Sequence, residues 1–309
     1  MTISTTTNLA SRQLDEITDT EVIGSIRQAV GALPQIELAY EASIKTLWIT
    51  LLPQPKPVFT YDVVASVHKV QRAVKGLWGA QESLAVSPVR FLAFRGRGPI
   101  YTLGGDLDFY LDCLAKGDRE ALLDYARVSA DCIAWNASCL RGSVITLATI
   151  HEKAFGGGID APRSCNVLIA ERRATFCYPE VAFNHFPIAA VGVLGRRVGA
   201  RCAHQIIDSG EKYSADDFFA LGALDAVTPT GEGEAWLRRY ARDSLPIHSA
   251  RLALFCAFHR QAGDLENELA EFAKVWAENL MRLPPIQIAK LQRIVSIQEK
   301  MLQSSSAGV

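Results

Sequence analysis

The sequence lacks the features that mark exported, membrane-inserted and disulfide-stapled proteins. No apolar run approaches the roughly eighteen residues of a membrane-spanning helix, and the N-terminus has neither a basic start nor an apolar signal core. The seven cysteines are odd in number and scattered, with neither a CxxC pair nor a His-rich zinc spacing. These absences argue against secretion and membrane insertion and predict a cytoplasmic protein with reduced, mostly buried thiols.

An excess of charge of one sign is also missing. The 32 basic and 33 acidic residues give a net charge of -1, so no overall field draws the chain to nucleic acid or to an anionic membrane. No GxSxG elbow or paired base accompanies Ser143, Ser164 or Cys165, so a nucleophilic triad is not expected. We therefore expect no metal, no nucleic-acid partner and no membrane partner.

The sequence has enough apolar residues to form a large hydrophobic core. The chain has 309 residues and is 49% hydrophobic, which permits one large core or a core with a smaller appendage. We divide it into an N-terminal extension lying outside the core (1–34), a mixed core (35–232) and a helical C-terminal region (233–309). The C-terminal region either serves assembly, closes over a neighbouring site, or forms one lobe of the same domain.

The periodicity of apolar residues predicts an α/β fold. Strand-like segments alternate with helical ones, and each strand ends in a glycine-containing loop, which indicates repeated ββα units. The expected elements are a hairpin over 35–52, a helix beginning near Tyr61, a strand over 89–94, a helix from about Arg119 to Leu140, a strand running into the glycines of 156–158, a helix start at Asp160, and a further strand pair over 166–171 and 174–178.

The glycine triplet 156–158 and the acids Asp160 and Glu180 are the strongest candidates for a site. Three glycines bring bare backbone N–H groups close to a ligand, or they form a tight turn with close packing. Asp160 is either a catalytic acid or a helix N-cap. Glu180 follows Pro179 in an apolar context, where an unpaired carboxylate is costly. It is either functional, or a loop side chain that is solvated or paired with a neighbouring arginine, Arg172 or Arg173.

Other polar residues have simpler explanations. Asp106 is expected to cap a helix or to form hydrogen bonds within its loop, rather than to act as a catalyst. His151 and His185 lie beside apolar segments, and we assign both to structural roles. Arg95 and Arg97 either meet phosphate groups of a ligand or are ordinary surface arginines.

Four segments, taken in order and spacing, resemble the crotonase (enoyl-CoA hydratase/isomerase) superfamily. They are RFLAFRGRGPIYTLGGDLDFY, AFGGGID, FCYPEVAFNHFP and SGEKYSADDFFALGALDAVTP. Within the superfamily, LGGDL, YPEVAF followed by FP, and the terminal VWAENLMRL are similar to the diffusible signal factor synthases. The resemblance covers roughly residues 35 to 300.

The resemblance implies a crotonase-type spiral of ββα units with a helical C-terminal region, assembled as a homotrimer or a dimer of trimers. It implies a lyase that dehydrates a medium-chain 3-hydroxyacyl thioester to a cis-2-enoyl product and hydrolyses the thioester, giving a fatty-acid signal. The substrate would be carried on acyl carrier protein or CoA, with no other cofactor. The alternatives are another crotonase reaction on acyl-CoA (hydratase, isomerase or hydrolase) and a non-catalytic relative that binds acyl thioesters.

The resemblance also assigns roles to individual residues. Gly105 and Gly157 match the positions whose backbone N–H groups form the oxyanion hole, and Glu180 and Asp160 match the two acids. Leu103 is expected to contact the acyl chain. Trp276 lies on the apolar stripe of a C-terminal helix, where core packing is the default, and the resemblance allows it to line the acyl pocket. Glutamate is usual at the first acid position, so Asp160 is shorter by one methylene, and Arg163 close by is a candidate partner for an acid.

Overall fold

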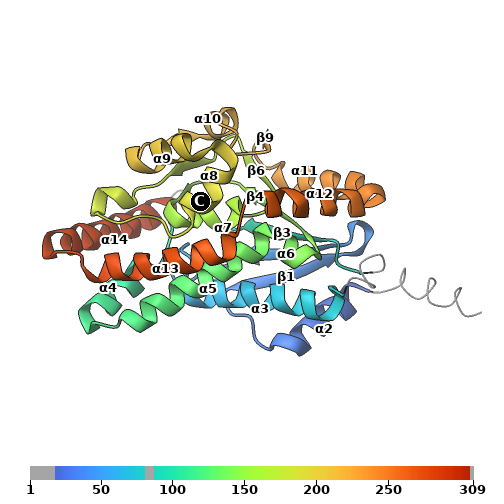
Figure 1. Cartoon of the computed structure of the whole chain (residues 1–309), viewed down its shortest axis with the longest axis horizontal. Helices are drawn as coiled ribbons and strands as arrows, with labels where there is room; N and C mark the ends of the chain where they lie inside the picture. Colours follow the sequence, from blue (N-terminus) through green and yellow to red (C-terminus); the bar gives the residue numbers. More distant parts are fainter. Residues whose placement is uncertain (1–17, 81–86, 307–309) are drawn as a thin grey trace, which may run out of the picture.

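The computed structural model of the chain describes residues 18–80 and 87–306. Two sheets lie at its centre, and helices cover them (Figure 1). The larger sheet has the strand order β1 (Ile36–Glu41), β2 (Thr46–Leu51), β3 (Phe91–Gly96), β4 (Ile145–Ile150), β6 (Val167–Glu171) and β9 (Ala226–Thr228). The smaller sheet has the order β5 (Ala154–Phe155), β7 (Thr175–Cys177) and β8 (Tyr213–Ser214).

The predicted hairpin is confirmed, because β1 and β2 pair antiparallel with Glu41 opposite Thr46. From β2 onwards, the neighbours in the larger sheet are parallel. All side chains of β2, β4 and β6 are buried, as expected for strands covered by helices on both faces. The predicted strand pair 166–171 and 174–178 is wrong as a pair, because β6 and β7 belong to different sheets.

The helices pack around the two sheets (Figure 1). They are α2 (Asp19–Val30), α3 (Tyr61–Trp78), α4 (Leu107–Lys116), α5 (Arg119–Ala137), α6 (Cys139–Gly142), α7 (Asp160–Arg163), α8 (Ala190–Val198), α9 (Ala200–Ser209), α10 (Ala215–Ala220), α11 (Gly233–Ser244), α12 (His248–Gln261), α13 (Leu265–Met281) and α14 (Pro285–Ser306). The expected helices near Tyr61 and from Arg119 are confirmed as α3 and α5. Helix α5 lies between α3 and α13 (Figure 1).

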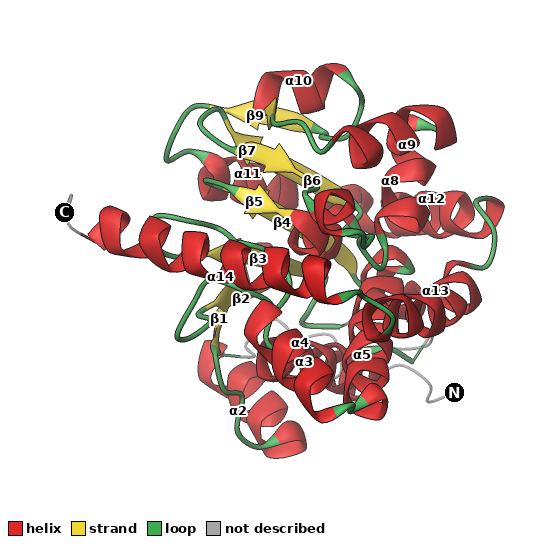
Figure 2. Cartoon of the chain, turned by 90° about the vertical axis from the view of Figure 1, so that its left-hand side faces the viewer, coloured by secondary structure: helices red, strands yellow, loops and turns green. Residues whose placement is uncertain are grey.

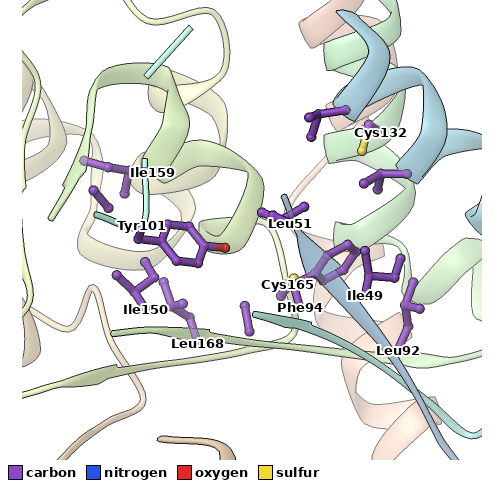
Figure 3. Packing of buried hydrophobic residues seen from close by; sticks show 14 of the residues in the cluster. Ile49, Leu51, Leu92, Phe94, Tyr101, Cys132, Ile150, Ile159, Cys165 and Leu168 are labelled. Carbon is purple, nitrogen blue, oxygen red and sulfur yellow. The ribbon is translucent and has the colours of Figure 1, made fainter. Parts of the chain in front are cut away.

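The main hydrophobic cluster packs the larger sheet against α2, α3 and α5, and it continues to α8, α9, α10 and the smaller sheet. Figure 3 shows Ile49 and Leu51 of β2, Leu92 and Phe94 of β3, and Cys132 of α5 within it. A second cluster, which includes Trp48, Phe91 and Leu237, lies against α11 and α12. Burial of this apolar surface is the dominant favourable contribution to folding.

The expectation that residues 1–34 lie outside the core is wrong for the described part of that segment. Val22 and Ile26 of α2 are fully buried in the main cluster. The helix begins with a capping box, in which the Thr18 hydroxyl accepts the Glu21 N–H at 3.3 Å. Residues 1–17 lie outside the described ranges.

The C-terminal helix α14 crosses in front of the larger sheet in Figure 2. Gln298 of α14 donates a hydrogen bond to the Leu103 carbonyl at 3.3 Å, and Glu299 pairs with Lys56 at 3.2 Å. This helix is therefore joined to the loop that carries Gly104 and Gly105, which form the first glycine motif; the triplet 156–158 is the second. The division of the chain at residue 233 remains a prediction.

Candidate active site

The two glycine motifs meet in space. Thr102 and Ala154 form a parallel bridge, and the Phe155 N–H donates to the Thr102 carbonyl at 3.1 Å. A Cβ built on Gly158 would lie only 3.0 Å from Cα of Gly104, which has a φ of +108°. This approach requires glycine on both sides, because a side chain on either segment would push the two backbones apart.

The glycine triplet is itself helical. Residues Gly156–Ile159 form the 3-10 helix η3, which runs directly into α7. Asp160 therefore lies inside a helical run, and the N-cap interpretation of this residue is wrong. Its side chain is only 1% exposed, and its Oδ1 accepts a 2.8 Å hydrogen bond from the Tyr178 hydroxyl. Asp160 is thus a buried carboxyl group held by a neighbouring strand end.

Glu180 is the second buried carboxyl group. It begins the 3-10 helix η4 (Glu180–Phe183), and its Oε1 accepts a 2.7 Å hydrogen bond from the Gly157 N–H. Its Oε2 is buried without a hydrogen-bond partner among the described residues. The alternative of pairing with a nearby arginine is wrong, because Arg172 pairs with Asp216 and Arg173 is closest to Glu152.

The two carboxyl groups flank Gly157. A Cβ on Gly157 would be 3.8 Å from Asp160 Oδ2, while a Cβ on the adjacent Gly156 would clash with Glu180 Oε1 at 2.3 Å. Glycine at position 156 therefore leaves room for Glu180, whereas a Cβ on Gly157 would make only an ordinary contact with Asp160. A substrate atom held at Gly157 would therefore lie close to both carboxyl groups.

Burial raises the pKa of both acids. For Glu180 the pKa rises to about 7, although the hydrogen bond from Gly157 acts in the opposite direction. For Asp160 burial raises the pKa well above its usual value, and the charge of Glu180 raises it further, against the effect of the Tyr178 hydroxyl. Burial therefore disfavours the charged form of both carboxyl groups, and Glu180 titrates near neutral pH. Carboxyl groups with raised pKa values in an apolar site are suited to donating and removing protons.

Asp160 and Glu180 line a cavity whose walls are mostly apolar. The volume of this cavity is about 100 Å³. Helices α13 and α14 contribute Trp276, Ile294 and Gln298 to its wall. An apolar wall around a few polar groups is typical of sites for small molecules with an apolar part.

All six residues assigned to the site from the sequence lie on this cavity. They are Leu103, Gly105, Gly157, Asp160, Glu180 and Trp276. The other candidates lie elsewhere or have structural partners. Asp106 caps α4 by accepting the Phe109 N–H, as predicted, and Arg95 pairs with Glu234 and lies over the Trp48 ring. Arg163, considered as a partner for an acid, forms no ion pair within the described chain.

His185 is a cavity residue that the sequence assigned to a structural role. Its Nδ1 is hydrogen-bonded to Oδ1 of Asn279, and burial lowers its pKa to about 4. Because that oxygen can only accept, Nδ1 carries the proton and Nε2 is an acceptor. In the described part of the chain this buried Nε2 has no partner. No local pattern could have shown this, because Asn279 is 94 residues away.

Tyr110 is a second residue that the sequence did not indicate. Its hydroxyl packs so closely on Gly105 that a Cβ there would lie 2.0 Å from it. The Tyr110 ring also meets Trp276 edge to face, at 5.0 Å between centroids. Tyr110 thus connects the first glycine motif to the aromatic wall of the cavity.

Neither a metal centre nor a membrane helix is found within residues 18–80 and 87–306. No group of three or more His, Cys, Asp or Glu side chains there is placed to hold a metal ion. None of the helices in these ranges is both long enough and apolar enough to cross a bilayer.

Comparison with known proteins assigns the chain to a family. The family model described as enoyl-CoA hydratase/isomerase matches residues 114–275, which is more than half of the chain. The chain belongs to this family, which is the superfamily that the sequence motifs predicted. The fold is accordingly the predicted mixed α/β crotonase fold with a helical C-terminal region.

Curated relatives are distant in sequence. Cyclohexa-1,5-dienecarbonyl-CoA hydratase of Thauera aromatica is 23% identical over 202 residues, which cover 65% of this chain and 74% of that protein. The peroxisomal bifunctional enzyme of Cavia porcellus is 28% identical over 234 residues. That match covers 75% of this chain but only 30% of the longer enzyme.

Solved structures show the same fold. The enoyl-CoA hydratase from Bacillus halodurans matches with a TM-score of 0.69 at 18% identity, over 84% of this chain and 99% of that one. DspI of Pseudomonas aeruginosa matches with a TM-score of 0.58 at 22% identity, over 75% of this chain and 86% of that one. At these identities the two structures establish a shared fold.

Proposed function

We propose that this protein dehydrates a medium-chain 3-hydroxyacyl thioester to a cis-2-enoyl thioester and then hydrolyses it to the free acid. The observation that carries the proposal is the pair of buried carboxyl groups, Asp160 and Glu180, on either side of Gly157 in an apolar cavity. The motifs shared with the signal factor synthases support the choice of substrate and product. The thioester would be carried on acyl carrier protein or CoA.

The mechanism begins with the thioester carbonyl. In this proposal its oxygen accepts hydrogen bonds from the N–H groups of Gly105 and Gly157, and such preorganised donors contribute about 3 to 4 kcal/mol each in acyl chemistry. The Gly157 N–H is bound to Glu180 in the structure, so the thioester oxygen must displace that carboxylate oxygen. Displacement removes a hydrogen bond that lowers the pKa of Glu180, and the carboxylate becomes a stronger base.

Two proton transfers then complete the elimination. Glu180 in its ionised form removes a proton from C2, and the electron pair moves onto the carbonyl oxygen at the two N–H groups. The enolate re-forms the carbonyl and expels the C3 hydroxyl, which leaves as water with a proton from Asp160, directly or through one water. Because aspartate is shorter than glutamate, transfer through a water suits this position. In the hydrolysis that follows, water attacks the thioester carbonyl and gives a proton to the ionised Asp160, directly or through a second water. Glu180 gives the proton that it took from C2 to the departing thiolate, so both acids return to their starting states.

The second candidate is another crotonase reaction on an acyl-CoA. One relative is named as a hydratase of cyclohexa-1,5-dienecarbonyl-CoA, and the same pair of acids could add water to a C2–C3 double bond. The third is an acyl-thioester-binding protein without turnover, for which aspartate in place of glutamate at position 160 is the motivating observation.

The test is turnover of a defined series of substrates. Purified protein is incubated with 3-hydroxyoctanoyl and 3-hydroxydecanoyl groups on acyl carrier protein and on CoA, and the products are separated by liquid chromatography and mass spectrometry. Glu180→Gln is compared with Glu120→Gln, which removes an exposed carboxylate on α5.

Each outcome selects one candidate. Formation of a cis-2-enoic acid that requires Glu180 supports the proposal. Interconversion of enoyl-CoA and 3-hydroxyacyl-CoA without release of a free acid selects the hydratase. If no substrate reacts and Glu180→Gln binds acyl-CoA as the parent does, the protein is not an enzyme of this type.

A further inference from the structure

A second cavity lies apart from the active site, between α7, α8, α12 and α13. The volume of this second cavity is about 350 Å³. Among the described residues none lines both cavities, because Ala161 and Pro162 face the first and Arg163 faces the second. This second cavity takes no part in the proposed reaction.

Arg163 is the unusual residue of the second cavity. Its side chain is 2% exposed, and its Nε, Nη1 and Nη2 atoms are all buried with no hydrogen-bond partner in the described parts of the chain. Burial, together with the charge of Arg197, lowers its pKa to about 9, so the guanidinium still carries its charge at neutral pH. A buried charge with five unused N–H donors is strongly unfavourable unless something binds it.

The neighbouring acids are already occupied. Arg197 forms an ion pair with Asp225 through two hydrogen bonds of 2.8 Å. Arg196 forms an ion pair with Glu268 through hydrogen bonds of 3.0 and 3.1 Å. Burial also lowers the pKa of His259 on the cavity wall, so this imidazole is mostly uncharged. The charge of Asp225 acts on Arg163 from a distance, but among the described residues no carboxylate contacts the Arg163 guanidinium.

The rest of the wall is suited to an apolar group. Val193 and Leu265 are buried there, and Phe255 and Phe258 lie towards the surface. A ligand that matches both parts has one negative charge and an apolar body. A carboxylate fits the charge and also the planar, two-pronged donor geometry of a guanidinium.

We propose that this cavity binds a small organic acid, with the carboxylate on Arg163 and the apolar part against Val193, Phe255 and Leu265. Because Arg163 is buried, its partner must enter the cavity, which a slim free acid can do. A carboxylate side chain from a second copy of the chain offers the same chemistry, and the experiment separates the two sources. The inference does not depend on the proposed catalytic function.

The test compares octanoate with octanamide, which has the same apolar chain without the charge. Binding is measured by calorimetry and by the shift in melting temperature, for the parent protein and for Arg163→Met. Arg282→Met, which changes an exposed arginine after α13, is the matched control. Any binding of octanoate in the apolar active-site cavity is the same in all three proteins. A difference in octanoate binding between them therefore reports on the second cavity.

We expect the parent and Arg282→Met to bind octanoate at this site, and octanamide at least about tenfold more weakly, because the amide lacks the charge. Arg163→Met should lose this preference and bind octanoate at least about tenfold more weakly. If Arg163→Met folds poorly, Arg163→Lys serves instead, because a single ammonium group keeps the charge but loses the two-pronged contact.

Two results would overturn the proposal. The cavity binds no acid if the parent and the Arg163 variant, Arg163→Met or its replacement Arg163→Lys, have the same affinity for octanoate and the same shift in melting temperature. A drop in molar mass by light scattering in the Arg163 variant, with an unchanged response to octanoate, would assign the carboxylate to a second copy of the chain.

Discussion

The N–H of Gly157 donates a 2.7 Å hydrogen bond to Oε1 of Glu180. This contact joins the predicted oxyanion donor to the predicted acid–base residue. In the proposed reaction, a thioester oxygen that takes the N–H also releases the carboxylate. Substrate binding and activation of the base are then one event, and the predictions below test its parts.

The rate of the reaction should depend on the ionisation of Glu180. Because its pKa is about 7 in the free protein, kcat/KM should rise with pH through an inflection near pH 7. Glu180→Gln should lower kcat/KM by roughly 10²- to 10⁴-fold and remove this inflection. A pH–rate profile measured for both proteins tests this, and an unchanged inflection in the variant would assign it to another group.

The same carboxyl group should make stability depend on pH. Its folded pKa is raised from 4.5 to about 7, so between these values the unfolded chain has lost a proton that the folded protein keeps. Stability therefore falls as pH rises through this window and is constant above it. Glutamine does not titrate, so the Glu180→Gln variant should not show this loss. Its free energy of unfolding, relative to that of the parent, should increase by about 3 kcal/mol from pH 4.5 to pH 8. Urea unfolding at several pH values measures the difference, and a gain at low pH instead would contradict the assigned shift.

Gly156 should not tolerate alanine. A Cβ there would clash with Glu180 Oε1, and the backbone has a φ of +56°. Gly156→Ala should therefore lower stability by about 1 kcal/mol or more and abolish activity. Gly195→Ala in α8 is the control, because nothing lies within 4 Å of its Cβ position. This control should gain up to about 1 kcal/mol, since alanine favours a helix. Equal melting temperatures in the two variants would show that the Gly156 site is less crowded.

Tyr178 should hold the carboxyl group of Asp160. Tyr178→Phe removes the 2.8 Å hydrogen bond to Oδ1 and should cost about 1 to 2 kcal/mol of stability. It should also reduce turnover, because Asp160 loses its orientation. Tyr40→Phe removes a buried hydrogen bond to the Pro88 carbonyl, away from the cavity, and should lower stability alone. Unfolding and turnover of both variants separate the two effects, and full activity in Tyr178→Phe would argue against a role for Asp160.

Trp276 should limit the length of the acyl chain. Its ring meets Tyr110 and His185, each at 5.0 Å between centroids, and lies on the cavity wall. Trp276→Phe should shift the preferred substrate towards longer chains by opening space. Trp276→Ala should also cost about 3 to 5 kcal/mol of stability. Competition among hexanoyl to tetradecanoyl substrates measures the shift, with Trp236→Phe as a control outside the cavity. An unchanged preference would place the chain end elsewhere.

Much of the fold could be predicted from the sequence, because its signals are local. Apolar residues at helical spacing predicted α3 and α5, and alternating residues between turn signals predicted the hairpin of β1 and β2. The glycine motifs and the two acids were also visible, because their residue types and spacing carry the family resemblance. Local patterns do not state which strands are neighbours, so the sheets of β6 and β7 were not foreseen.

The sequence by itself determined which residues could form a site: two glycine motifs, two acids and an apolar C-terminal stripe. Only the tertiary structure decided their relations, including the hydrogen bond from Gly157 to Glu180 and the pairing of His185 with Asn279. It also decided that the buried guanidinium of Arg163 has no hydrogen-bond partner among the described residues. The physical reason is that burial and partnership depend on groups far apart in the chain. A carboxylate or guanidinium acquires its pKa and its role from the neighbours that folding places around it.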